Sequence, residues 1–268
     1  MAILIDGHVH IYPSFSLSCF FDTAWNNFSK ISAAQGVSGE QDYALFLTEG
    51  GENDVYEKLC KRADSDESVS SNTFRFQRTE EAECLLAERD GCCMYVFAGR
   101  QYVSSENIEL LSLFSRKRIT DKSLTLSELA QAVTDAGGIV VVPWGVGKWF
   151  GKRGVTIRNY FDLPHTYPVF AGDNGNRPFF WPSPTLFLDA QKNGVKLLSG
   201  SDPLPLAMHY DRVATSGTII ANGEISKNLP VTSLRQQLKS GKEMREFGKR
   251  LSSGRFFFDQ FRMNVFRR

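Results

Sequence analysis

Two histidines near the start of the chain are spaced so that they could bind one metal ion. His8 and His10 directly follow the short apolar segment Ala2–Ile5. In a β-strand, the side chains of residues i and i+2 project from the same face, so both imidazoles can point at one metal. The whole chain has 4 histidines, which favours a metal site over two unrelated histidines beside a loop. A carboxylate from elsewhere in the chain would complete such a site.

A second apolar segment leads into a residue that could supply this carboxylate. Lys196–Ser199 has the pattern of a strand, and Gly200-Ser201-Asp202 follows it. Asp202 is therefore expected at the C-terminal edge of a strand, where it could bind the metal or act as the base for a metal-activated water. The alternative is an aspartate that begins a turn before Pro203.

The elements that must position these residues alternate between strands and helices. Apolar residues have helical spacing in Cys19–Ala34, Asp54–Ala63, Leu126–Val133 and Leu186–Gln191, whereas Tyr43–Thr48, Ile139–Pro143, Val169–Ala171 and Thr218–Ile220 resemble strands. Such alternation is typical of parallel sheets, whose strands end at one common edge. We therefore predict one α/β domain over residues 1–268, with the candidate ligands at that edge.

Two parts of the chain depart from this alternation. Residues 73–103 have the pattern of antiparallel strands, with Asp90-Gly91 as a hairpin turn. We expect these strands to be an addition to the α/β unit. Near the end of the sequence, Met244–Leu251 is predicted to be a helix and Arg255–Phe266 a strand packed on the body.

The composition argues against a membrane or secreted protein. The chain has 268 residues, 42% of them hydrophobic, and a net charge of +1. No apolar run approaches the roughly 18 residues that a membrane span needs. The N-terminal residues lack the features of a signal peptide, and the 5 cysteines include no C-x-x-C pair. We therefore expect a cytoplasmic protein with reduced thiols.

The charge of the last part of the chain is uneven. Residues 235–268 include ten basic and three acidic side chains. One interpretation is a surface that binds phosphate or nucleic acid. We favour the other, in which these charges cover the solvated faces of terminal helices, and nucleic acid is not an expected partner.

Taken together, the motifs resemble those of the PHP (polymerase and histidinol phosphatase) family of metal-dependent hydrolases, within the wider amidohydrolase-like barrels. The resemblance is clearest in Asp6-Gly7-His8-Val9-His10 and Gly200-Ser201-Asp202. Leu126–Pro143, a helix ending in Gly-Gly before an apolar strand, is similar to a further element of the family. The resemblance implies a distorted (β/α)7 barrel of the TIM type, with a regular eight-stranded barrel as the alternative. It also implies a site at the C-terminal mouth of the barrel.

Compared with that family, the chain keeps only part of the metal-binding set. Glu49 preserves a carboxylate, whereas Gln101, Trp144 and Leu204 stand where metal-binding residues are expected. The resemblance therefore implies one divalent ion, Zn²⁺, Mn²⁺ or Fe²⁺, held by His8, His10, Asp202 and Glu49. An indole has no free lone pair for a metal, so we expect Trp144 to offer a flat face to the substrate at the mouth.

Two polar loops could contact a small anionic substrate. Gly145–Gly154 contains Lys148 and Arg153, and Gly172–Pro178 contains Asp173 and Arg177. Glycine-rich cationic loops can hold a phosphate or carboxylate, and an arginine can clamp an anion. An ordinary surface loop and an Asp-Asn-Gly turn are the alternatives.

The sequence therefore predicts a divergent metal-dependent hydrolase, with Asp202 as the catalytic residue and a phosphoester as the preferred substrate. The residues expected to contact the substrate are Arg177, Lys148, Arg153, Trp144, Gln101 and Asp173. One alternative is a mononuclear amidohydrolase that acts on C–N or lactone bonds. The other is a catalytically inactive binding or scaffold protein with a PHP-like fold.

Overall fold

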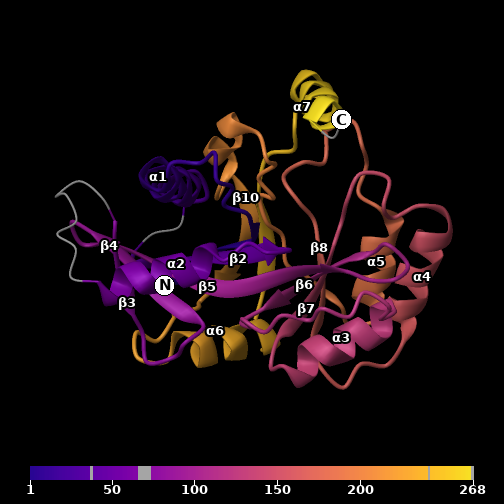
Figure 1. Cartoon of the computed structure of the whole chain (residues 1–268), viewed down its shortest axis with the longest axis horizontal. Helices are drawn as coiled ribbons and strands as arrows, with labels where there is room; N and C mark the ends of the chain where they lie inside the picture. The colour runs from indigo at the N-terminus through magenta and orange to yellow at the C-terminus, as the bar shows by residue number, and fades with distance from the viewer. Residues whose placement is uncertain (37–38, 66–73, 241, 267–268) are drawn as a thin grey trace.

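The apolar strands form one strongly curved sheet in the computed structural model, which describes residues 1–36, 39–65, 74–240 and 242–266 (Figure 1). The strands that run parallel are β1 (Ala2–Val9), β2 (Gln41–Gly50), β5 (Cys92–Val103), β7 (Ile139–Pro143), β8 (Val169–Gly172) and β9 (Lys196–Leu197). Antiparallel strands are β6 (Glu109–Leu113), which lies between β5 and β7, and β10 (Ser216–Ala221) and β11 (Met244–Gly248), which lie beyond β1. The parallel strands therefore share one C-terminal edge.

The segment that follows β9 returns to β1 and nearly closes the sheet into a barrel. The Gly7 N–H donates to the Ser199 carbonyl at 3.0 Å, and the Asp202 N–H donates to the His8 carbonyl at 2.8 Å. These bonds join the two ends of the sheet beside the two histidines. The distorted barrel predicted from the sequence is confirmed, and its closure brings residues almost 200 positions apart into contact.

Strand β1 is buried on both faces. Ile5 packs in a cluster with Leu234 of α6 (Pro230–Lys239), whereas Leu4 packs in a second cluster with Phe20 of α1 (Leu17–Ala34). A strand covered on both faces has an uninterrupted apolar sequence. This explains why the apolar start of β1 is recognisable as a strand. His8 lies within this rigid element and His10 directly follows it.

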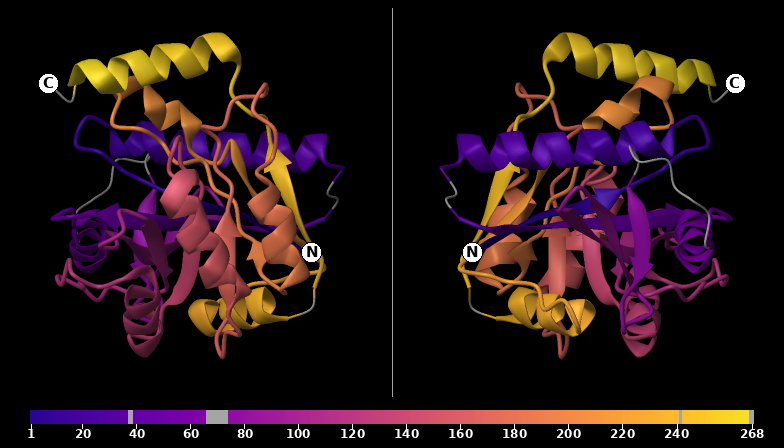
Figure 2. Two further views of the ribbon diagram at one scale, coloured as in Figure 1. Left: turned by 90° about the vertical axis from the view of Figure 1, so that its right-hand side faces the viewer. Right: turned by 90° about the vertical axis from the view of Figure 1, so that its left-hand side faces the viewer.

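Helices cover the outside of the barrel. They include α2 (Val55–Asp64), α3 (Leu126–Asp135), α4 (Gly151–Asp162) and α5 (Thr185–Lys192). Figure 2 shows α1, the 3-10 helix η1 (Ala207–Arg212) and α7 (Ser253–Phe266) on one side of the barrel and α6 on the opposite side. Within the described ranges, no helix has both the length and the apolar character that a membrane crossing requires.

The antiparallel strands predicted for residues 73–103 are present, although Thr73 itself lies outside the described residues. β3 (Arg75–Arg78), β4 (Cys84–Arg89) and β5 form an antiparallel series. Asp90 and Gly91 both have positive φ, 52° and 79°, as a two-residue hairpin of the primed type requires. The series is not a separate insertion, because β5 is also a strand of the barrel.

Three expectations for elements are wrong. Met244–Leu251 contains strand β11 rather than a helix, because it pairs antiparallel with β10 and buries Phe247. Residues 255–266 lie in helix α7 rather than in a strand. Among residues 253–264 of this helix, Phe256 and Asp259 are the buried positions, and the exposed phenylalanines around them disguise the helical period. Helix α4 begins inside the Gly145–Gly154 segment that was expected to be a loop.

Candidate metal centre

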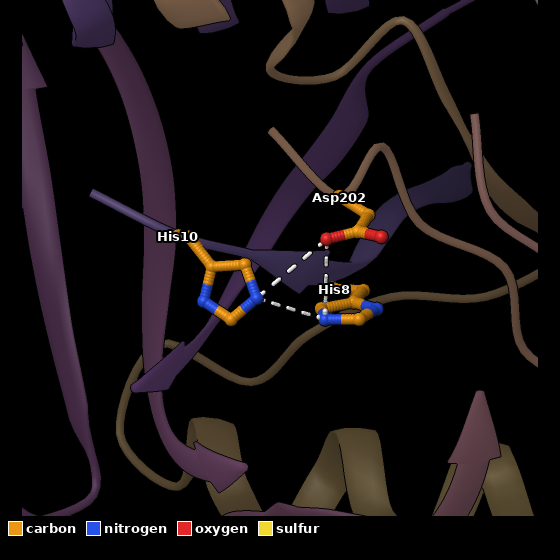
Figure 3. Close-up of side chains that lie close together, drawn as sticks. All are labelled: His8, His10 and Asp202. Carbon is orange, nitrogen blue, oxygen red and sulfur yellow. Dashed lines mark hydrogen bonds and ion pairs between the residues drawn. The ribbon is translucent and has the colours of Figure 1, made fainter. Parts of the chain in front are cut away.

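Three potential metal ligands converge at the C-terminal end of β1 (Figure 3). The Nε2 atoms of His8 and His10 lie 3.0 Å apart, and each is 3.6 Å from Oδ1 of Asp202. In the part of the chain that the structure describes, these residues are the one such group of three, with ligand atoms all within 4.8 Å of one another. The structure therefore brings together the two histidines and the aspartate singled out by the sequence.

Tight backbone packing places these side chains. A Cβ atom on Gly200 would lie 2.2 Å from the His8 nitrogen and 2.6 Å from the His8 Cβ. Only glycine allows the two segments to approach so closely. Asp202 has a φ of 48°, in the left-handed region that few residues other than glycine adopt. Such strained backbone is common at functional sites.

The buried carboxylate of Asp6 joins the two segments from below the site. It accepts hydrogen bonds from the N–H and hydroxyl of Ser201 at 2.8 and 2.5 Å, from the Ala214 N–H at 2.8 Å and from the His8 N–H at 3.3 Å. Burial raises the pKa of Asp6 to about 6, although these hydrogen bonds oppose the shift. Asp6 thus ties β1 to the loop that carries Asp202.

Two carboxamides contact the candidate ligands. The Asn174 side chain donates from Nδ2 to Oδ2 of Asp202 at 2.9 Å and to the Trp144 carbonyl at 2.8 Å. Oε1 of Gln101 lies 3.2 Å from Nε2 of His8. Burial, and then the nearby His8, lowers the pKa of His10 to about 4. His10 is therefore neutral at pH 7, which is the form that binds a metal.

A cavity of about 500 Å³ lies beside the three ligands. Its wall includes Tyr12, whose pKa is raised by burial and then by the Asp202 and Glu109 charges. Lys148 also borders it and forms an ion pair with Glu109. Helix α7 contributes Gln260, Met263 and Asn264 to the wall. The ligands therefore face a space large enough for a small substrate.

Several of these wall residues were missed by the sequence reasoning. The alternation of His8 and His10 continues to Tyr12, and this period of two could have revealed Tyr12. Asn174 lies in the polar loop that was singled out, but for other residues. The residues of α7 had no usable signal, because that segment was predicted to be a strand.

Glu49 does not join the other candidate ligands. Its carboxylate accepts hydrogen bonds from the N–H groups of Val55 and Tyr56, the latter at 3.1 Å, at the start of α2. It also lies 3.7 Å from Nη1 of Arg100. Carboxylates are stabilised at helix N-termini by the unpaired N–H groups and the helix dipole. The structure thus gives Glu49 a helix-capping position instead of the predicted ligand position.

Two of the cations expected to bind substrate are engaged elsewhere. Arg177 is 1% exposed and forms an ion pair with Asp173, and it also donates to the Trp181 carbonyl at 3.0 Å. Arg153 donates to the Gly147 carbonyl at 2.9 Å, and it is absent from the cavity wall. The expected roles of Arg177, Asp173 and Arg153 as direct substrate contacts therefore do not fit the structure, whereas Lys148 does border the cavity.

Trp144 and Gln101 both border the cavity, as expected from the sequence. The Trp144 side chain is 1% exposed and packs edge-on against Trp181, with the ring centres 5.9 Å apart. Its carbonyl anchors Asn174. Whether the indole forms a platform for a substrate stays a prediction.

No protein family model and no curated protein sequence matches this chain. Solved structures of other proteins do align with it. PsfC from Pseudomonas syringae aligns with a TM-score of 0.56 and 15% identity over 98% of this chain and 99% of its own. The lesion-specific endonuclease Q from Pyrococcus furiosus aligns with a TM-score of 0.55 and 12% identity over 91% of this chain, which spans 58% of that protein.

At these identities the alignments show a shared fold. The chain therefore shares the fold of these two proteins, in agreement with the distorted barrel that the sequence predicts. The alignment with PsfC extends over nearly all of both chains.

Proposed function

We propose that this protein is a metal-dependent hydrolase that holds one divalent ion between His8, His10 and Asp202. The observation that carries the proposal is the convergence of their three ligand atoms beside a cavity. Metal–nitrogen distances of about 2.0–2.1 Å in a tetrahedral site place neighbouring ligand atoms roughly 3.3 Å apart. The separations here are 3.0, 3.6 and 3.6 Å, so the donor set fits Zn²⁺, Mn²⁺ or Fe²⁺.

The surrounding residues suit hydrolysis. A divalent ion in such a site acts as a Lewis acid and lowers the pKa of water to about 7. Oδ1 of Asp202 faces the imidazoles and Oδ2 is held by Asn174, which fixes the proposed catalytic carboxylate. Tyr12 stays protonated at neutral pH because burial raises its pKa, and it can donate a hydrogen bond to a substrate oxygen. Lys148, which also pairs with Glu109, lies on the cavity wall, where it can contact negative charge on the substrate.

A phosphoester is the proposed substrate class. The support comes from the fold shared with an endonuclease and from Lys148 on the cavity wall. A C–N or lactone bond is the second candidate. It is favoured by the engagement of Arg177 with Asp173, which leaves Lys148 as the cationic side chain that borders the cavity within the described residues.

Metal analysis and a substrate panel test the proposal. We expect about one equivalent of metal after reconstitution with Zn²⁺, Mn²⁺ or Fe²⁺, and hydrolysis of a p-nitrophenyl phosphomonoester or phosphodiester. His10→Ala should lose both metal and activity. His165→Ala removes an imidazole that hydrogen-bonds the Tyr160 carbonyl outside the cavity, so it should leave both unchanged.

The same measurements identify the alternatives. Less than about 0.1 equivalent of metal after reconstitution would refute the metal centre. Cleavage of lactones or N-acyl amino acids without cleavage of phosphoesters would refute the substrate class. A full equivalent of metal with no hydrolysis in either series would point to the inactive binding protein instead.

A further inference from the structure

Residues of α1, η1 and α7 line a second, strongly basic groove. Figure 2 shows these three helices on one side of the barrel. The groove has a volume of about 410 Å³, and residues of the 249–252 segment and the start of α7 complete its wall. Five cationic side chains line this basic groove: Lys30, Arg212, Lys249, Arg250 and Arg255. No acidic side chain is among the described residues that line it. It is therefore distinct in charge from the metal cavity.

Two arginines in the groove have buried donors without partners. Arg212 donates from Nη2 to the Gly175 carbonyl at 2.7 Å, but its Nε atom is buried and has no hydrogen-bond partner. Arg255 donates from Nε to the carboxylate of Asp259 at 3.1 and 3.2 Å, whereas its Nη2 atom is buried and unpaired. Buried donors are normally satisfied, because an unsatisfied one costs free energy. Both arginines line the groove, so each has donor capacity there that the described residues leave unused.

The positive charges in the groove are incompletely balanced. Burial and then the like charge of Arg255 lower the pKa of Arg212. The acidic groups that act on Arg212, which include Asp211 and Asp259, do not line the groove. Lys30 and Lys249, which are both exposed, add two further positive charges to the wall. A bound anion would relieve this repulsion.

We infer that the basic groove binds a phosphate group, as inorganic phosphate or as part of a small phosphomonoester. Guanidinium groups match the oxygens of phosphate with paired hydrogen bonds. Ser252 borders the groove immediately before α7, and its hydroxyl accepts a hydrogen bond from the Arg255 N–H at 3.4 Å, so the first turn of this helix adjoins the groove. The cations surround one concavity rather than forming a track, which suits a small ligand better than a nucleic-acid strand.

This anion site lies next to the metal centre but does not depend on it. Gly175, which accepts the hydrogen bond from Arg212, lies between Asn174 and Asn176, and both of these border the metal cavity. The inference therefore stands even if the protein proves to hold no metal. It also gives the basic C-terminal segment a role that was set aside at the level of sequence.

Titration with inorganic phosphate tests the site in protein stripped of metal with a chelator. Calorimetry should show saturable binding at one site. Arg212→Gln should weaken it by about tenfold or more, because hydrogen bonds to charged groups are strong. The matched control is Arg158→Gln, which removes an equally charged side chain that pairs with Asp189 outside the groove. It should bind phosphate as the wild type does.

Lys249→Gln provides a second variant if Arg212→Gln fails to fold, because Lys249 is exposed. It should weaken phosphate binding severalfold. Equal phosphate affinity in the wild type and both groove variants would overturn the inference. Phosphate binding that is lost when the metal is removed would also overturn it. A single-stranded oligonucleotide that binds much more tightly than phosphate, and loses affinity in Arg212→Gln, would overturn the assignment to a small ligand.

Discussion

Replacing Asn174 by alanine should weaken metal binding without touching any of the three candidate ligands. The Asn174 Nδ2 atom donates to Oδ2 of Asp202 at 2.9 Å, and this contact leaves Oδ1 directed at the imidazoles. In Asn174→Ala the carboxylate is free to rotate, and it loses a hydrogen bond that stabilises its charged form. Asn174 would therefore act as a positioning residue.

The expected magnitude follows from the type of bond that is lost. A hydrogen bond to a charged group contributes about 1.5–3 kcal/mol, which corresponds to roughly a 10- to 100-fold change in affinity. Residues that orient metal ligands typically have effects in the same range, about 10- to 100-fold. Asn174 also supports the Trp144 carbonyl and accepts a bond from the Asn176 N–H at 3.1 Å, so some loss of stability should accompany the change.

Competition with a chromophoric chelator would measure the metal affinity, and thermal unfolding would be followed with and without metal. A metal raises the stability of the folded state by an amount set by its dissociation constant. The metal-induced rise in Tm should therefore shrink in Asn174→Ala. A purely structural role would lower both Tm values equally and leave that rise unchanged.

The matched control is Asn193→Ala. Its amide donates to the carboxylate of Asp162 at 2.7 Å on the surface, away from the cavity. This variant removes the same type of bond and should keep the wild-type metal affinity. The reasoning is refuted if folded Asn174→Ala binds metal as tightly as the wild type, or if Asn193→Ala loses as much affinity.

Three further outcomes are expected. Gly200→Ala would place its Cβ 2.2 Å from the His8 nitrogen. It should therefore lower the free energy of unfolding by about 1–3 kcal/mol and also weaken metal binding. A denaturant unfolding curve identical to that of the wild type would contradict the close packing. Asp259→Ala would remove the carboxylate whose Oδ1 atom lies 3.1 Å from Nε2 of the buried His209. It should speed chymotrypsin cleavage of α7, whereas a wild-type cleavage rate would show that this pair does not hold the helix. Burial lowers the pKa of His165, so the folded state favours the neutral imidazole. The stability that the neutral imidazole contributes is therefore lost as the pH falls below the ordinary histidine pKa of about 6.5, because the unfolded chain then binds the proton more readily. His165→Asn should therefore lose less Tm than the wild type between pH 7 and 5, and parallel curves would argue against this role.

The sequence by itself predicted the residues at the centre of the candidate site. His8 and His10 follow an apolar strand at a spacing of two, and Asp202 follows another such strand. Both patterns are local. The apolar start of β1 is buried on both faces of the sheet, and such burial is visible in the sequence as a run of apolar residues. The Asp90-Gly91 hairpin was readable for the same reason, since its turn demands residues that tolerate positive φ.

The sequence could not show which charged groups would find one another. Arg177 and Asp173 read as a polar loop that could bind an anion, yet they pair with each other. Glu49 read as a ligand, yet it caps α2. The role of a charged side chain depends on which opposite charge lies nearest to it in the folded protein. The local sequence carries little information on the distance between the two groups.

Only the tertiary structure decided what surrounds the candidate metal centre and where the basic segment lies. Asn174 reaches Asp202 because the barrel closes beside β1, and α7 supplies cavity residues because the buried Asp259 pairs with His209. The segments 244–251 and 255–266 were assigned to the wrong elements for the same reason. Short amphipathic segments can form either element, and pairing with β10 or packing over the barrel mouth selects between them.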